Sequence, residues 1–266
     1  MSDHKNFALV TGASSGIGLA ISNELAKRGF PLLMISNEDE KLRDAACDLE
    51  NKHGIKTAHL CIDLAANDCA PEIFNFCQTN GIIVDILVNN AGIFFFKDVI
   101  DTPPELAFKI INLHNVTPFY LTQLFSQKMI ADNRKGYILM MASVSSRMMM
   151  PGIALYSGTK GFLRSFARSM RNEIYDKGVS ITTVSPGAVA TNLYNLPLRY
   201  QKLGIFLGVI MTPERLAYLA VKKMLKRKAE FIPGAFINTL FIIIVRTLPG
   251  FLIRIIKRKI DIKRSQ

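Results

Sequence analysis

A tyrosine and a lysine are spaced for proton transfer near the middle of the chain. Tyr156 and Lys160 stand four positions apart in a stretch with helical spacing of apolar residues. Residues at i and i+4 share one face of a helix, so the two side chains would be neighbours. A free tyrosine has a pKa of about 10, and a neighbouring ammonium group lowers that value. The pair could therefore exchange a proton with a ligand, although a tyrosine and a lysine at this spacing are also common on exposed helix faces.

A glycine-rich turn lies near the start of the chain. Thr11–Gly18 reads TGASSGIG, follows the apolar run Phe7–Val10 and leads directly into a helical pattern. Glycines allow the backbone to approach a ligand closely, and free N–H groups at a helix start favour anionic oxygens. The spacing differs from GxGxxG. The turn predicts a phosphate-binding loop, with a purely structural turn as the alternative.

Further motifs follow in order along the chain: Asn89–Gly92, Asn112, Ser143, Tyr156–Lys160 and Pro186–Thr191. Together with the TGxxxGxG turn, this series resembles the short-chain dehydrogenase/reductase family over about residues 5–232. The resemblance implies an NAD(P)-dependent oxidoreductase that transfers a hydride between nicotinamide and a carbonyl or secondary alcohol. The alternative is a catalytically silent dinucleotide-binding regulatory or scaffold protein.

The resemblance also implies roles for four residues. Hydride transfer to a carbonyl leaves negative charge on oxygen, so the site must stabilise that charge and supply a proton. Tyr156 would be the acid/base, and Ser143 would bond the substrate oxygen. Lys160 would lower the pKa of the tyrosine, and Asn112 would hold a water that links Lys160 to solvent.

A larger set of residues is expected around the coenzyme. By the same resemblance it comprises Gly12, Ser14, Ser15, Gly16, Ile17, Gly18, Ser36, Asn37, Asp63, Leu64, Asn89, Ala91, Gly92, Tyr156, Lys160, Pro186, Gly187, Val189 and Thr191. For Asp63 a turn cap is an equal alternative.

The choice between NAD and NADP depends on the end of the second expected strand. A carboxylate there binds the 2′-OH of NAD, and an arginine accommodates the 2′-phosphate of NADP. Ser36 and Asn37 supply neither group. Glu38 could reach the ribose, but an acidic residue also suits the start of the next helix. The missing aspartate favours NADP.

Apolar side chains follow strands whose carboxyl ends should face the cleft. Phe94 and Met149 belong to such segments, and Tyr194 lies where relatives close over substrate. With Ser143 and Tyr156 they are expected to contact a hydrophobic, lipid- or steroid-like substrate. Packing of loops or of an oligomer contact is the alternative role.

Brief apolar runs alternate with amphipathic stretches up to about residue 232. The runs cover 7–10, 31–35, 57–62, 85–88, 137–141 and 180–184, and the stretches between them include 17–28, 38–53, 104–131 and 156–177. Such runs are typical of strands buried on both faces of a sheet. The alternation predicts an α/β fold, with a Rossmann-type doubly wound parallel sheet and helices on both faces, as a single domain over residues 1–232.

The tail, residues 233–266, is apolar and basic. Residues 222–266 hold 12 of the 33 basic and 2 of the 21 acidic side chains, so most of the net charge of +12 lies there and binding of nucleic acid is not expected. The apolar run 235–245 is shorter than the twenty or so residues that span a bilayer. The tail could contact a membrane surface, another subunit or the substrate pocket.

The amino-terminal residues and the cysteines bear on the cellular location of the protein. The start shows no secretory pattern and the four cysteines form no CxxC pair, so we expect a cytoplasmic protein, with peripheral membrane association as an option, reduced thiols and no metal site. The family resemblance also implies a homo-oligomer, a dimer or tetramer, that pairs through helices near 104–131 and 156–177.

Overall fold

The structure is a computed structural model that describes residues 6–148, 150–191, 193, 198–206, 209–234, 238, 242, 243, 245, 247–255 and 257. Its centre is a sheet of parallel strands in the order β3-β2-β1-β4-β5-β6-β7. The strands are β1 (Phe7–Thr11), β2 (Leu32–Ser36), β3 (Thr57–Cys61), β4 (Val84–Asn89), β5 (Gly136–Met141), β6 (Val179–Val184) and β7 (Glu230–Phe231). The six strands expected from the apolar runs are present, and the predicted fold class is confirmed. The two-residue β7 gave no pattern to detect.

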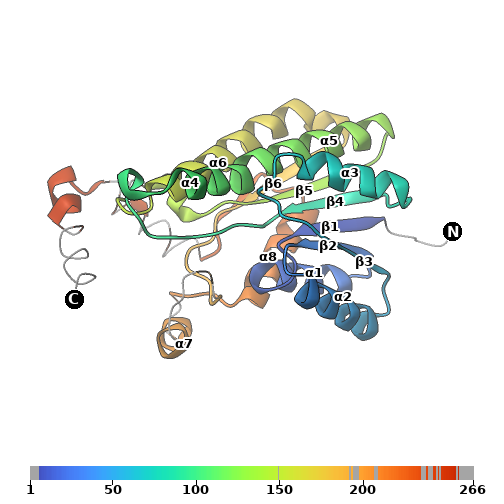
Figure 1. Ribbon diagram of the computed structural model, residues 1–266, viewed down its shortest axis with the longest axis horizontal. Helices are drawn as coiled ribbons and strands as arrows, with labels where there is room; N and C mark the ends of the chain where they lie inside the picture. The colour runs from blue at the N-terminus through green and yellow to red at the C-terminus, as the bar shows by residue number, and fades with distance from the viewer. Residues whose placement is uncertain are drawn as a thin grey trace.

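Helices cover both faces of the sheet (Figure 1). One layer holds α1 (Gly16–Lys27), α2 (Asp39–His53) and α8 (Pro213–Leu225), and the other holds α3 (Cys69–Thr79), α4 (Pro104–Ile111), α5 (Thr117–Ala131) and α6 (Ala154–Ile174). Each layer has its own core, with Ile21 and Leu42 buried on one side and Ile73 and Leu121 on the other. Full burial of such a side chain contributes about 1.5–3 kcal/mol.

Among the described residues there are also the shorter helices η1 (Val99–Asp101), η3 (Val144–Arg147), η4 (Tyr175–Lys177) and α7 (Leu198–Phe206). The single helix expected over 104–131 is interrupted between α4 and α5. Asn112–Val116 there form a π-helical turn, η2. Pro118 has no N–H to donate to the carbonyl of His114, so the regular hydrogen-bond ladder cannot continue through this point. Leu113 and His114 are the buried side chains of this turn.

The strand order reverses between β1 and β4. In open α/β sheets a crevice forms at such a point, beyond the carboxyl ends of the strands. The glycine-rich turn follows β1, and the Asn89–Gly92 motif follows β4. The fold therefore brings these two motifs together.

Candidate active site

The glycine-rich turn is packed too closely to accept side chains. Gly12 has φ +66°, and a Cβ there would lie 2.9 Å from the Cα of Ala91. A Cβ on Gly18 would lie 1.9 Å from the carbonyl oxygen of Gly12. Gly18 thus packs against the backbone of Gly12 and does not line the pocket, where it was expected. Helix α1 begins at Gly16, which leaves free N–H groups at the turn.

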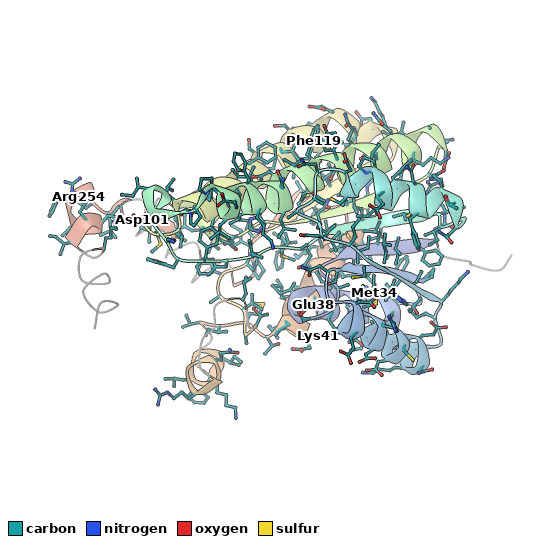
Figure 2. All side chains as sticks on the ribbon, in the orientation of Figure 1. Met34, Glu38, Lys41, Asp101, Phe119 and Arg254 are labelled. Carbon is teal, nitrogen blue, oxygen red and sulfur yellow. The ribbon has the colours of Figure 1, made fainter. Side chains whose placement is uncertain are left out.

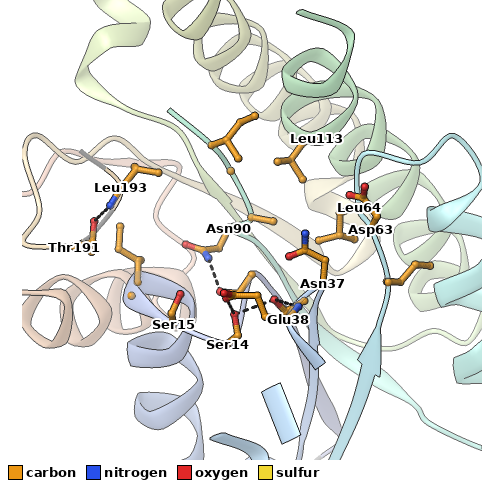
Figure 3. A pocket seen from close by; sticks show the side chains of 18 of the residues that line it. Ser14, Ser15, Asn37, Glu38, Asp63, Leu64, Asn90, Leu113, Thr191 and Leu193 are labelled. Carbon is orange, nitrogen blue, oxygen red and sulfur yellow. Dashed lines mark hydrogen bonds between the residues drawn. The ribbon is translucent and has the colours of Figure 1, made fainter. Parts of the chain in front are cut away.

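A cavity of about 540 Å³ opens above this turn (Figure 3). Of the expected coenzyme residues it is lined by Gly12, Ser14, Ser15, Gly16, Ile17, Ser36, Asn37, Asp63, Leu64, Ala91, Gly92 and Thr191. Glu38, which the sequence offered as a possible ribose contact, also lines it, and so do residues without an expected coenzyme role: Ile62, Asn90, Ile93, Lys109, Leu113, Ala190 and Leu193. Its lining residues run from the end of β2 to the segment after β6, an extent suited to a dinucleotide.

A carboxylate stands at the β2 end of this cavity. Glu38 accepts a hydrogen bond from the hydroxyl of Ser14 at 2.8 Å and also pairs with Lys41. The hydroxyls of Ser14 and Ser36 are 2.9 Å apart. Hydrogen bonds from Lys41 and then Ser14 lower the pKa of the Glu38 carboxyl, so it is ionised near neutrality. The corner that lacks an aspartate in sequence therefore still presents a negative charge.

The segment after β3 is held by Asn112. The side-chain amide of Asn112 donates to the carbonyl of Ala65 and to the side chain of Asn67, both at 3.1 Å. Asp63 accepts the N–H of Ala65 at 3.0 Å, which is the turn cap considered from sequence, and it also lines the cavity. Asn112 thus supports the β3 side of the coenzyme cavity, and it is not among the residues that line the small cavity around Lys160, where its water-mediated link was expected.

Two neighbouring asparagines after β4 have different roles. Asn89 is buried and its amide donates to the hydroxyl of Thr122 on α5 at 3.0 Å, so it ties the strand to a helix and does not line the cavity. Asn90 lines the cavity, and its amide donates to the carbonyl of Thr11 at 3.0 Å. Asn90 therefore joins the β4 end to the glycine-rich turn.

A smaller cavity of about 50 Å³ continues from the first and contains the expected reacting group. Ser143, Tyr156 and Lys160 line it together, and each is at most 6% exposed. The expected coenzyme residues Pro186, Gly187, Val189 and Thr191 line it as well. Ile17, Asn90, Gly92, Ile93, Thr191 and Leu193 line both cavities, which makes them one cleft.

Lys160 is the most deeply buried charge of this group. Its ammonium donates to the carbonyl of Met141 at 2.9 Å and lies 5.7 Å from the centre of the Tyr156 ring. Burial lowers the pKa of Lys160 from 10.5 to about 8. The ammonium form therefore still predominates at neutral pH, where it favours a negative charge on the tyrosine oxygen.

Ser143 lies two residues after the end of β5, in an extended conformation, and caps the start of η3. Its hydroxyl oxygen accepts the N–H of Ser145 at 3.2 Å, and the N–H of Val144 donates to the carbonyl of Pro186. These bonds fix the segment on which the Ser143 hydroxyl stands. The hydroxyl proton remains available for a ligand oxygen.

His114, from the π turn, also lines the small cavity and was missed in the sequence. It is fully buried, and its ring centre lies 5.7 Å from that of Tyr156. Its Nε2 accepts the N–H of Ile93 at 3.0 Å, and its Nδ1 lies 2.9 Å from the hydroxyl of Thr159. Burial, and then the charge of Lys160, hold its pKa well below 6.5. His114 does not stand out in the sequence because only the π turn directs its side chain into the small cavity.

Aromatic and apolar side chains border the reacting group. Phe94 packs edge-on against Tyr156, with ring centres 5.0 Å apart. Phe96 occupies the space beside Gly152, where a Cβ would lie 2.2 Å from its ring. The other expected substrate contacts, Met149 and Tyr194, lie outside the described residues.

Parts of the tail pack beside this region. Ile242 and Val245 form a buried cluster with Val144 and Met148, which follow Ser143. Lys257 pairs with Asp98. Figure 2 places Arg254 and Asp101 at the same end of the molecule. In the described part of the chain, no helix is long and apolar enough to cross a membrane.

Known proteins resemble this chain along most of its length. A family model described as short chain dehydrogenase matches residues 6–197. A very-long-chain 3-oxoacyl-CoA reductase of Danio rerio is 35% identical over 192 residues, which are 70% of this chain and 60% of the relative. The uncharacterized oxidoreductase YmfI of Bacillus subtilis (strain 168) is 32% identical over 241 residues, 87% of this chain and 96% of that protein.

A solved structure supports the fold. A short-chain dehydrogenase from Sphingobium yanoikuyae in complex with NADPH has a TM-score of 0.77 at 22% identity, and the match covers 88% of this chain and 92% of that one. Likeness at this level of identity concerns the fold alone. The matches to the family model and to the two relatives go further, since they rest on sequence over most of the chain: this chain belongs to the short-chain dehydrogenase family.

Proposed function

We propose that this protein is an NAD(P)-dependent oxidoreductase that interconverts a carbonyl group and a secondary alcohol. The observation that carries the proposal is the cleft in which Ser143, Tyr156 and Lys160 line one small cavity continuous with the larger one. The larger cavity combines a glycine-rich turn, a helix start and the β1/β4 crossover, which together fit a dinucleotide. Bound there, the nicotinamide supplies or accepts the hydride.

Each residue of the group would have a separate role. In the reducing direction the carbonyl carbon gains a hydride, and its oxygen gains a proton from the Tyr156 hydroxyl. Ser143 donates a hydrogen bond to the same oxygen and offsets its developing charge. The Lys160 ammonium favours the tyrosinate that remains. In the oxidising direction the tyrosinate accepts the alcohol proton.

The substrate we propose is hydrophobic, of a lipid- or long-chain acyl-type. Phe94 contacts the Tyr156 ring, and Met148 packs beside the Ser143 segment. Apolar and aromatic side chains around a few polar groups are typical of sites for such ligands. The Danio rerio relative is described as a very-long-chain 3-oxoacyl-CoA reductase, which agrees with this class.

We propose that the coenzyme is NADP or NAD, which differ by the 2′-phosphate. The missing aspartate favours NADP, as the sequence indicated. Glu38 acts in the opposite direction because its carboxylate repels a 2′-phosphate, whereas Lys41 attracts it. The preference is therefore set by the balance between these two side chains.

The function is tested with a panel of carbonyl compounds and alcohols of increasing chain length, each with NADPH and with NADH. We expect turnover of apolar substrates. Tyr156→Phe should lower kcat by about 10²–10⁴-fold while coenzyme binding is retained. Tyr218→Phe, which removes the same hydroxyl from a tyrosine 45% exposed on α8, is the matched control. Coenzyme binding without turnover of any compound would instead support the scaffold alternative.

Contact between the tail and an anionic membrane surface is a second part of the proposal. Phe251 and Ile255 are exposed at 54% and 45%, beside the exposed Arg254. Apolar side chains that enter the interface next to basic ones are typical of peripheral helices. We expect Phe251→Ser with Ile255→Ser to abolish flotation with phosphatidylserine vesicles. These positions are preferable to deletion of the tail, which would also remove Ile242 and Val245 from their cluster with Val144 and Met148.

Self-association through α5 and α6 is the third part. Phe162 and Tyr120 are exposed at 46% and 43%, and the ring of Phe166 contacts those of Phe119 and Phe162. Exposed aromatic clusters on two long helices are suited to a paired interface. Light scattering after chromatography should give at least a dimer, and Phe162→Glu should shift it towards the monomer.

A further inference from the structure

His114 joins three elements that carry the reacting group. It stands on the π turn, accepts the N–H of Ile93 after β4, and contacts the hydroxyl of Thr159 on α6. Thr159 lies between Tyr156 and Lys160 in sequence. A Cβ added to Gly92 would lie 2.8 Å from Nε2 of His114 and 3.6 Å from Nζ of Lys160. The imidazole thus fills the space between the β4 end and the lysine.

The hydrogen bonds define the state of the imidazole. The N–H of Ile93 can only donate, so Nε2 of His114 carries no proton. A neutral ring then has its proton on Nδ1 and donates to the Thr159 hydroxyl oxygen. The Thr159 hydroxyl in turn donates to the carbonyl of Tyr156 at 2.9 Å. Both ring nitrogens are occupied, and neither is free to exchange a proton with a ligand.

Protonation of His114 would disrupt this arrangement. A proton on Nε2 would face the N–H of Ile93, with loss of that hydrogen bond. It would also place a second buried cation beside Lys160. The titratable groups that line the small cavity within the described residues are His114, Tyr156 and Lys160. The imidazole is therefore suited to hold neighbours in place, and it is unsuited to serve as an acid or base.

We propose that His114 is a positioning residue that, as a neutral imidazole, fixes the Tyr156–Lys160 turn of α6 against the β4 end and keeps water away from the Lys160 ammonium. This inference rests on the proposed function, because it assigns His114 a part in the same reaction. It replaces the water-mediated relay expected of Asn112. A relay would connect Lys160 to solvent, whereas a buried ring with both nitrogens bonded separates them.

The test compares the wild type with His114→Ala and His114→Gln. Glutamine offers an acceptor to Ile93 and a donor to Thr159, so it is the conservative variant, whereas alanine opens space for water beside Lys160. In the coenzyme-free protein, lysine side-chain NMR should show Lys160 with a pKa of about 8 in the wild type and His114→Gln. In His114→Ala that pKa should rise by at least about one unit, because burial is its cause.

Kinetics provide the second measurement. In His114→Ala we expect kcat to fall by about 10–100-fold, while the dissociation constant of the coenzyme stays within about threefold. His114→Gln should recover most of kcat. If His114→Ala does not fold, Thr159→Val removes the other end of the bridge at nearly constant volume and should lower kcat in the same way.

The outcomes separate this inference from the function on which it rests. Normal kcat and an unchanged Lys160 titration in both His114→Ala and Thr159→Val would overturn the positioning role. So would a limb of the wild-type kcat–pH profile near pH 6.5 that disappears in His114→Gln, because it would show a titrating imidazole. Absence of turnover in the wild type, or an undiminished Tyr156→Phe, would instead refute the proposed function.

Discussion

At the glycine-rich turn of the coenzyme end the packed backbone leaves no room for a Cβ, whereas at the reacting end buried side chains fill the space and form hydrogen bonds. Gly12 and Gly18 could not carry a Cβ without a clash. His114 and Lys160 are both buried, with hydrogen bonds to Ile93, Thr159 and Met141. The first end is therefore sensitive to added atoms, and the second to lost hydrogen bonds and to water.

Lys160→Met should have the largest effect: it should lower kcat and raise the stability of the fold. Loss of the ammonium should lower kcat by about 100-fold or more. The same change should stabilise the coenzyme-free protein by on the order of 1–3 kcal/mol at pH 7, because a buried charge is removed. Chemical denaturation and kinetics of one preparation measure both effects.

The stability difference between Lys160→Met and the wild type should depend on pH. Burial lowers the pKa of Lys160 to about 8 in the folded protein, against 10.5 when exposed. Below pH 8 the folded wild type carries the buried charge, so the variant has its full advantage. Between pH 8 and 10.5 the folded protein releases this proton first, and the advantage shrinks. An advantage that grows across this interval would contradict the burial of Lys160.

Gly18→Ala tests the coenzyme end. The added Cβ would lie 1.9 Å from the carbonyl of Gly12, so the turn or α1 must shift. We expect a loss of about 1–3 kcal/mol in stability and weaker coenzyme binding, measured by thermal unfolding and by calorimetry. Gly158→Ala on α6 is the control, since nothing lies within 4 Å of its Cβ, and it should be neutral or stabilising. An equal loss of stability in Gly18→Ala and Gly158→Ala would show that close packing at the glycine-rich turn is not the cause.

Glu38→Gln should change coenzyme preference without affecting the chemical step. Removal of the carboxylate lessens repulsion of a 2′-phosphate, so the ratio of kcat/KM for NADPH over NADH should rise by about 3–10-fold. Glu40→Gln, in the first turn of α2 but outside the cavity, should leave the ratio unchanged. A fall in the ratio would mean that Glu38 contributes to binding of the phosphate through Lys41.

Asn112→Ala should have the smallest effect. It distinguishes the coenzyme end of the cleft from the reacting end most directly. Its amide supports the segment after β3 through Ala65 and Asn67. We expect the KM for coenzyme to rise by about two- to tenfold, as for loss of one or two hydrogen bonds. The kinetic signature should thus be in KM, opposite to that of His114→Ala. A fall in kcat alone would restore the role first expected of Asn112.

Much of the fold follows from patterns that sequence makes visible. Runs such as Phe7–Val10 and Ser180–Val184 are apolar throughout because their strands are buried on both faces. The glycine-rich turn is detectable because Gly12 and Gly18 have no alternative residue type at their positions. Strand β7 escaped detection since two residues, Glu230 and Phe231, form no pattern.

The reacting group was only partly predictable. Tyr156 and Lys160 lie on a regular helix, so their spacing specifies a shared face. Asn112 and His114 lie on a π turn, where the period of 3.6 residues fails, so helical spacing does not specify which of their side chains faces the cleft. Pro118 is the signal that could have indicated an irregular turn. The buried state of His114 depends on contacts with β4 and α6, which no local pattern encodes.

The packing of Ile242 and Val245 against Val144 and Met148 has a practical consequence for protein engineering. Residues about a hundred positions from the Ser143 segment share its hydrophobic cluster. Libraries that seek altered substrate preference should therefore diversify positions 242 and 245 together with 148, rather than the loops next to the motifs alone. For the same reason an affinity tag should not be fused directly to the tail that supplies Ile242 and Val245 to this cluster.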